Sequence, residues 1–553
     1  MMSTSFSLFT RILTTAICVV GLGCHADAAH ASNYPQRERG ASPRSDQSVQ
    51  LTDAGIAALE RGDQVAAREL FQRALKANPR NEAAHTYLGI IADRAGALVE
   101  AEQHFAAAAR HAPASPAAHN NHGAVLLRLG RTAQAAAQFE ASLRLDPKQP
   151  SALVNLAQIR FASGTPEALR AARELFERAH AIAPEAEVSR ALVVIALRLG
   201  ERQKAVENFR VYAAALGEAK SEVVKPAARA ELGAALFEAG LFEEALAELS
   251  AAVALDPANA DAVLWLALTQ RERKDIAAAG RTLEAAIARG IETPALYAAL
   301  AEVYEASGHI ENAIPAMRLA IERDPQNEAY RFRYGMLLTD TKAPAAAIIR
   351  LQESLTLFPR SSKLWFALGV AQAASDKYDE AARSFDRALE FEPRFAPALA
   401  YLGMTHAQQG RFGEAVALYE RALAINDQLA AAHYLLADAM LQQQGADNAR
   451  LERHLTRSVE LDPAFLPARL ALAKLYLRTE RATEAVAQLE RIVAADPAQA
   501  DAQYQLGQAY RRLKRMTEAQ TALAAFKRLS ETQRTQSQEG QKEIARRLAN
   551  VRF

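Results

Sequence analysis

Histidines in the stretch HNNHG, from His119 to Gly123, are the residues of this chain best suited to metal chemistry. His119 and His122 are three residues apart, which on a helix places both rings on one face, and His85 lies 34 residues before His119. Imidazole nitrogens are frequent zinc ligands. No carboxylate stands at ligand spacing, however, and both rings fall at packing positions of the repeat described below. We therefore expect partly buried packing histidines, with no metal and no cofactor.

Motifs of catalytic sites are missing from the sequence. It contains no P-loop, no glycine-rich strand-to-helix turn and no G-x-S-x-G motif. The alternating pattern typical of strands, which usually support such sites, is also missing. The 65 basic and 64 acidic residues leave a formal net charge of +1, which argues against nucleic acid as the main partner. The chain is predicted to have no enzymatic activity.

The histidines belong to helices of a repeated unit. Pro79, Pro113 and Pro147 are 34 residues apart, and the same step recurs along the chain as far as Pro497. If this proline is numbered position 32 of a unit, the first unit begins at Ser48. His119 and His122 then occupy positions 4 and 7 of the third unit. A fixed period of this length indicates stacked supersecondary units.

Three columns of the repeat explain how two helices can pack. Position 8 is small, position 20 is almost always alanine and position 24 is large and apolar, as in Gly123, Ala135 and Phe139. Small residues let two antiparallel helices approach, and the large residue fills the groove between them. Proline at position 32 cannot continue the second helix. Glycines near position 15 should end the first helix in a left-handed conformation; these are Gly62, Gly96, Gly130, Gly200, Gly308 and Gly410.

These columns resemble the tetratricopeptide repeat family over residues 48–531, as fourteen units. The resemblance implies an all-α fold, a right-handed superhelical solenoid of about fourteen antiparallel helix pairs. Repeats 1–5 are expected at 48–217 and repeats 6–14 at 226–531, separated by an interruption at 218–225. Extra residues lengthen the fourth and twelfth units. The tail at 532–553 is expected to form a capping helix, because its apolar residues fall on one face.

The N-terminal segment predicts export. A weakly basic start is followed by an apolar run of twelve residues, too short to span a bilayer. An A-x-A pattern ends at Ala31, so residues 1–31 are expected to be a signal peptide cut after Ala31, with a flexible leader at 32–47. The alternatives are lipidation at Cys24, the one route to membrane association, or an uncut N-terminus. Cys18 and Cys24 are the only cysteines, so the repeats contain no disulfide.

The resemblance also implies where a partner would bind, since in this family the first helices line the inner, concave wall. Two interpretations of the stripe at positions 5, 9 and 12 stay open: a groove for a partner segment, or residues that only pack on the next repeat. The apolar candidates are Leu264, Leu268, Phe332, Met336, Phe366, Val370, Met404, Tyr434, Leu470 and Tyr504.

Comparison with two subfamilies argues against two known modes of peptide recognition. Repeats that grip chaperone carboxylates use lysine at position 5 and asparagine at position 9, whereas the first unit has Thr52 and Ile56. Repeats of the O-GlcNAc transferase use an asparagine ladder at position 6, and only Asn121 and Asn155 match it.

The sequence thus predicts a protein-binding or peptide-binding scaffold exported to the periplasm or outer membrane, or secreted, supporting assembly or secretion of a complex. An alternative is a non-catalytic docking subunit of a polysaccharide synthase, export or glycosyltransferase system. The oligomeric state is left open.

Overall fold

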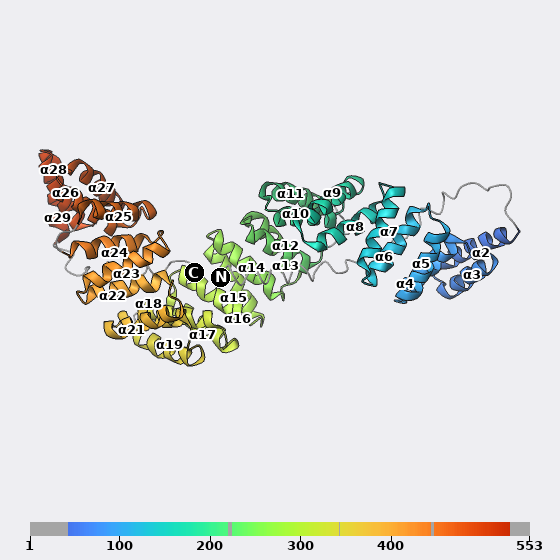
Figure 1. The fold of residues 1–553 in the computed structure, drawn as a ribbon, viewed down its shortest axis with the longest axis horizontal. Coiled ribbons are helices and arrows are strands. Elements are labelled where there is room, and N and C mark those ends of the chain that lie inside the picture. Colours follow the sequence, from blue (N-terminus) through green and yellow to red (C-terminus); the bar gives the residue numbers. More distant parts are fainter. Residues whose placement is uncertain (1–42, 219–223, 342, 444–446, 531–553) are drawn as a thin grey trace. The chain divides into compact units, whose positions relative to one another are not determined.

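The computed structural model describes residues 43–218, 224–341, 343–443 and 447–530, which form 28 α-helices and no strand (Figure 1). The all-α prediction is therefore confirmed. The signal peptide, most of the leader and the capping helix at 532–553 lie outside the described residues. Among the described helices, none is long and apolar enough to cross a membrane.

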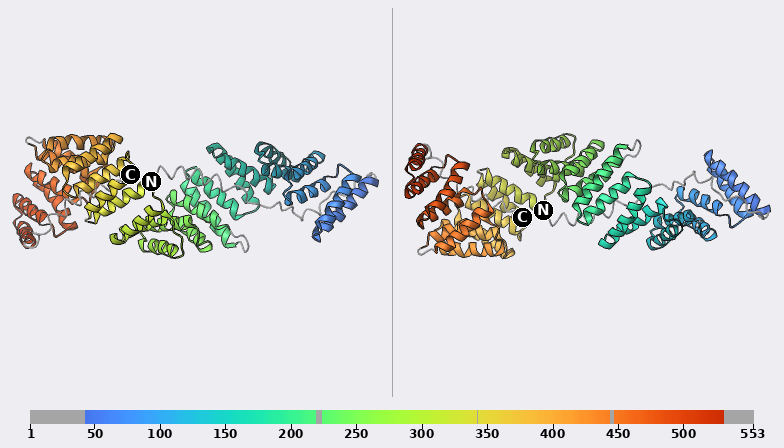
Figure 2. Two further views of the ribbon diagram at one scale, coloured as in Figure 1. Left: turned by 90° about the horizontal axis from the view of Figure 1, so that it is seen from below. Right: turned by 90° about the horizontal axis from the view of Figure 1, so that it is seen from above.

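The chain divides into two compact units, and the boundary in the sequence lies between Ile291 and Glu292. Each unit contains seven helix pairs (Figure 2). We call the first helix of a pair the A helix and the second the B helix. Each A helix packs against its own B helix, and within a unit most B helices pack against the next A helix.

The A and B helices of the first unit have the following bounds: α2 (Pro43–Glu60) and α3 (Gln64–Ala77), α4 (Glu82–Arg94) and α5 (Leu98–His111), α6 (Pro116–Arg128) and α7 (Thr132–Leu145), α8 (Pro150–Ser163) and α9 (Pro166–Ile182), α10 (Ala186–Arg198) and α11 (Arg202–Glu218), α12 (Pro226–Glu238) and α13 (Phe242–Leu255), α14 (Ala260–Glu272) and α15 (Ile276–Ala288).

Those of the second unit are α16 (Pro294–Ala306) and α17 (Ile310–Arg323), α18 (Glu328–Asp340) and α19 (Pro344–Leu357), α20 (Ser362–Ala373) and α21 (Tyr378–Phe391), α22 (Ala396–Gln408) and α23 (Phe412–Ile425), α24 (Ala430–Leu441) and α25 (Asn448–Leu461), α26 (Leu466–Arg478) and α27 (Ala482–Ala495), α28 (Ala500–Arg512) and α29 (Met516–Ser530).

The ends of the A helices have the left-handed glycines that the sequence predicts. All six glycines expected to be left-handed have positive φ, for example +73° at Gly130. Glycine tolerates this conformation because it has no Cβ. Four other pairs place a non-glycine residue there, with φ of 64° at Lys274, 59° at Asp376, 63° at Glu480 and 59° at Lys514. The turn is thus a property of the repeat, and glycine is its least strained occupant.

The close approach of A and B helices also agrees with the sequence pattern. Ala135 and Phe139 are fully buried on α7, and a Cβ added at Gly123 of α6 would lie 2.7 Å from Cε1 of Phe139. The same contact joins Gly55 to Phe71, Gly89 to Phe105 and Gly369 to Phe385.

Irregular repeats differ from the others in helix length. The extra residues of the fourth unit lengthen α9 to 17 residues, whereas α7 has 14. The first helix begins at Pro43, five residues before the predicted start at Ser48. Beside the predicted interruption, α11 continues to Glu218, and α12 packs more on α10 than on α11. This junction is bridged by Tyr212 of α11, which donates a 3.1 Å hydrogen bond to Glu248 of α13.

Candidate binding face

The predicted partner-binding residues lie on A helices of both units, but their exposure differs. Tyr504 on α28 is 39% exposed. Half-buried are Asn121, Asn155, Leu264, Leu268, Phe332, Met336, Met404, Tyr434 and Leu470. Phe366 and Val370 on α20 are buried, with 0% and 8% of their surface exposed.

Phe366 belongs to the core, so the prediction that its side chain faces a groove is wrong. Its ring centroid lies 5.2 Å from those of Phe395 and Tyr401, and 5.9 Å from that of Phe385. Aromatic rings at such distances stabilise one another through favourable edge and offset geometries. At this repeat, position 5 follows the packing interpretation.

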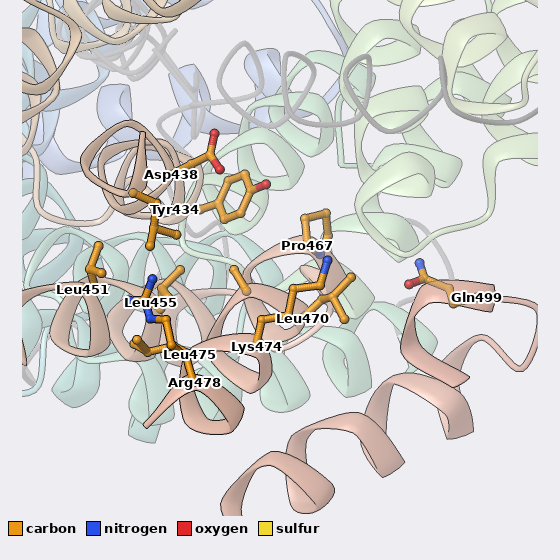
Figure 3. A pocket seen from close by; sticks show the side chains of 12 residues that line it. Tyr434, Asp438, Leu451, Leu455, Pro467, Leu470, Lys474, Leu475, Arg478 and Gln499 are labelled. Carbon is orange, nitrogen blue, oxygen red and sulfur yellow. The ribbon is translucent and has the colours of Figure 1, made fainter. Parts of the chain in front are cut away.

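A hollow of about 430 Å³ opens among the helices of repeats 12 and 13 (Figure 3). Leu451 and Leu455 of α25, both fully buried, and Leu475 of α26 supply apolar lining. The complete lining is Tyr434, Asp438, Leu441, Leu451, Leu455, Pro467, Leu470, Ala471, Lys474, Leu475, Arg478 and Gln499.

Charged groups stand beside this apolar lining. Asp438 is exposed on α24, while Lys474 and Arg478 are exposed on α26. Lys474 Nζ lies 2.5 Å from Asp501 Oδ2, and Arg478 donates a 2.6 Å hydrogen bond to Asn448. Tyr434 is held edge-on against Phe465, with the ring centroids 5.3 Å apart. The hollow can therefore take an apolar side chain while charged groups of both signs meet its flanks.

Tyr434 and Leu470 line this hollow and were predicted from the sequence as binding residues. Asp438 and Lys474 also line it but were not predicted. Both missed residues occupy position 9, one turn after Tyr434 and Leu470 at position 5. Their position in the repeat could therefore be recognised from the sequence. They were not predicted because the candidates at this position were restricted to apolar residues.

The HNNHG histidines point to different partners. His119 Nδ1 lies 2.8 Å from Gln138 Oε1, and its Nε2 lies 3.1 Å from the carbonyl oxygen of Pro113. His122 Nε2 lies 3.3 Å from Glu102 Oε1. Burial lowers the pKa of His122. These rings are half-buried and join helices, as the packing interpretation expects. The described part of the chain holds no cluster of three or more potential metal ligands.

A contact that the sequence did not reveal recurs at position 4. In at least seven of the described repeats, the side chain at this position reaches the backbone carbonyl at position 32 of the preceding repeat, six residues earlier. The side chains are His85, His119, Arg331, Trp365, His433, Arg469 and Gln503.

In at least five of the described repeats, the side chain at position 4 also contacts the side chain at position 23 of the B helix. These pairs are His85–His104, His119–Gln138, Arg229–Glu248, His433–His454 and Arg469–Gln488. Such a bond fixes the A helix to its B helix and, through the carbonyl contact, to the preceding turn. The arrangement is structural and contains no nucleophile paired with a base.

Comparison with solved structures finds repeat proteins of low identity. A tetratricopeptide repeat protein from Parabacteroides merdae is 17% identical, with 45% of this chain and 97% of that chain covered and a TM-score of 0.39. The Cut9–Hcn1 hetero-tetramer of the APC/C is 14% identical, with 84% and 97% covered and a TM-score of 0.39. A comparison with curated proteins found no match.

Sequence models of the repeat match both units. Tetratricopeptide repeat models match residues 52–116, 120–168, 294–337, 350–398, 366–430, 402–460 and 470–533, and a TPR repeat model matches residues 233–273. These segments cover more than half of the chain and coincide with the helix pairs described above. The chain belongs to the tetratricopeptide repeat family.

Proposed function

We propose that this chain is an exported, non-catalytic scaffold that binds a segment of a partner protein along its A helices, in support of assembly or secretion of a multiprotein complex. Tetratricopeptide repeats are protein-interaction modules. The observation that carries the proposal is the hollow of repeats 12 and 13, where Tyr434 and Leu470 stand half-buried beside charged groups.

The chemistry of the hollow favours a peptide with an apolar anchor. An apolar side chain removed from water contributes about 25 cal/mol per Å² of buried surface. Tyrosine is frequent among the residues that dominate binding energy, because it offers a large rigid surface with a polar tip. Asp438 and Lys474 would favour a partner with charges of both signs next to its anchor, since charge complementarity selects among partners.

A crosslinking experiment tests this face directly. A photoreactive phenylalanine analogue placed at Leu470 should crosslink a defined protein of the cell envelope. The matched control is Ile349, which is 56% exposed on the B helix α19. Tyr434→Glu in the Leu470-labelled protein should remove the crosslink. Equal crosslinking from both positions, or a crosslink insensitive to Tyr434→Glu, would contradict the proposal.

Export is supported by the N-terminal sequence, namely the apolar run and the A-x-A pattern ending at Ala31. Mass spectrometry of the protein purified from its native host distinguishes the outcomes. A mature N-terminus at Ser32 supports signal-peptide cleavage and localisation in the periplasm or outside the cell. An acylated Cys24 at the N-terminus would instead support membrane attachment, and an intact Met1 would refute export.

A further inference from the structure

Two of the position 4 to position 23 bridges consist of two histidines. His433 of α24 and His454 of α25 bring their Nδ1 atoms to 3.0 Å, and His85 of α4 and His104 of α5 bring theirs to 3.1 Å. The two pairs lie in different units but occupy the same repeat positions. Their geometry limits how many protons each pair can hold.

The hydrogen on each ring can be placed from its partners. His433 Nε2 lies 3.1 Å from the backbone oxygen of Asp427, which can only accept, so Nε2 carries a hydrogen. In the neutral ring Nδ1 is then an acceptor, and the facing Nδ1 of His454 must donate. The hydrogen of His85 is assigned to Nε2 in the same way, because this atom lies 3.1 Å from the backbone oxygen of Pro79.

A closed pair therefore accepts fewer protons than an open one. One added proton can go to Nε2 of His454 while the bond survives, but a second would place two N–H groups facing each other. When α24 and α25 separate, both rings can be protonated independently. Opening the pair in acid therefore takes up at least one proton.

The surroundings of His454 oppose even the first proton. Burial, followed by the charges of His433, Arg450 and Arg453, lowers its pKa to about 4, although Asp427 acts in the opposite direction. His433 also has a lowered pKa, chiefly through burial; it faces Asp427 of the turn, which raises that pKa, and Arg457 of α25, which lowers it.

The second-repeat pair has similar neighbours. Burial is the main cause of the lowered pKa of both His85 and His104. The charged groups facing this pair are His111, Arg110 and Glu100 of α5, and Arg68 of α3.

We infer that the His433–His454 and His85–His104 pairs are acid-sensitive latches, which hold α24 to α25 and α4 to α5 and weaken as the pH falls below the usual range for histidine. The native pKa values lie below the ordinary value of 6.5, so the open state binds more protons. The stabilisation that each pair contributes is therefore complete above about pH 6.5. For His454 it is lost progressively as the pH falls towards about 4.

The third repeat contains a version of the bridge with a single histidine. In the third repeat, His119 faces Gln138 at the same two positions. A glutamine amide can rotate to present either its oxygen or its NH₂ group. The His–Gln bridge therefore avoids the conflict between two facing rings.

The latch of repeat 12 also bears on the hollow, because Tyr434 follows His433, and Leu451 and Leu455 flank His454. This consequence rests on the proposed function: acid would loosen the walls of the partner site. The latch itself can be tested without a partner, so its failure and the failure of the proposed function are distinguishable.

Amide hydrogen exchange on the full chain, corrected for intrinsic rates, measures helix opening at about pH 7.5 and about pH 5. In the wild type, protection of α24 and α25 should fall by about tenfold per pH unit for each proton taken up, below about pH 6.5. Helices α26 and α27, which contain no histidine and are joined by Arg469 and Gln488 at the same two positions, provide the internal control.

His454→Gln copies the third-repeat bridge and should reduce the pH dependence of α24 and α25 alone, because His433 remains buried. His104→Gln should do so in α4 and α5 alone. The inference is overturned if α24 and α25 respond to acid no more than α26 and α27, or if His454→Gln leaves their response unchanged. If that variant does not fold, an NMR titration of the wild type decides: a His454 pKa at or above the ordinary histidine value refutes the latch.

Discussion

The ring of Phe139 fills the space that a side chain at Gly123 would need, since an added Cβ would lie 2.7 Å from Cε1 of that ring. Gly123→Ala should therefore destabilise the third repeat by about 1–3 kcal/mol through overpacking. A lower urea midpoint and faster amide exchange in α6 and α7 would show the effect.

The chain also suggests a compensating change. The corresponding positions of another repeat hold Ala267 and Leu283, and both side chains are buried. The double variant Gly123→Ala with Phe139→Leu copies that pair and should regain part of the lost stability. Equal stability of Gly123→Ala and the wild type would contradict the packing described here.

Left-handed turns provide a second prediction. Lys274 has φ of 64°, a conformation that costs a residue with a Cβ about 1–2 kcal/mol. Lys274→Gly should relieve this strain. The resulting stabilisation of α14 and α15 should be somewhat smaller than the strain energy, because glycine loses more entropy on folding. The reverse change, Gly130→Ala, should destabilise α6 and α7 by a similar amount. Hydrogen exchange of the two helix pairs checks both, and the same sign for both substitutions would disprove the argument.

Helix pairs and their turns could be predicted from sequence because their residue types recur with a fixed period. Gly130 is left-handed and Gly123 lies under a large residue, so steric constraints favour glycine at the turn and a small residue at position 8. The bridge at position 4 could not be predicted in this way. His119, Trp365 and Arg469 share only the ability to donate a hydrogen bond to a carbonyl, so the column looks variable.

The partner face was the least predictable part for a related physical reason. Position 5 lies where one A helix passes the next, and its exposure depends on the size of neighbouring side chains. Three rings enclose Phe366, whereas Tyr504 remains 39% exposed at the same position of a later repeat. Spacing identifies the stripe, but the neighbouring repeat decides which of its residues reach the surface.

Two buried tyrosines allow the hydroxyl group to be tested separately from the ring. Tyr419 is fully buried, and its hydroxyl has no hydrogen-bond partner among the described residues. Tyr419→Phe should be neutral or stabilising, because it removes an unsatisfied polar group. Tyr212 is also fully buried, but its hydroxyl donates to Glu248.

Tyr212→Phe should therefore cost about 1.5–3 kcal/mol, the usual range for a hydrogen bond to a charged group. Urea unfolding followed by far-ultraviolet circular dichroism compares the two variants. A larger loss from Tyr419→Phe than from Tyr212→Phe would show that the hydroxyl of Tyr419 has an important partner.

The contrast between Phe366 and Tyr504 separates packing from binding. Phe366→Glu puts a carboxylate among three rings and should destabilise its repeat by at least about 3–5 kcal/mol, the cost of losing a buried aromatic side chain. Tyr504→Glu changes an exposed side chain and should leave helicity and the urea midpoint nearly unchanged. If the proposed binding face extends to α28, Tyr504→Glu should also weaken capture of the protein crosslinked at Leu470. Loss of capture by Ile349→Glu, on the B helix α19, would show instead that added negative charge alone is responsible.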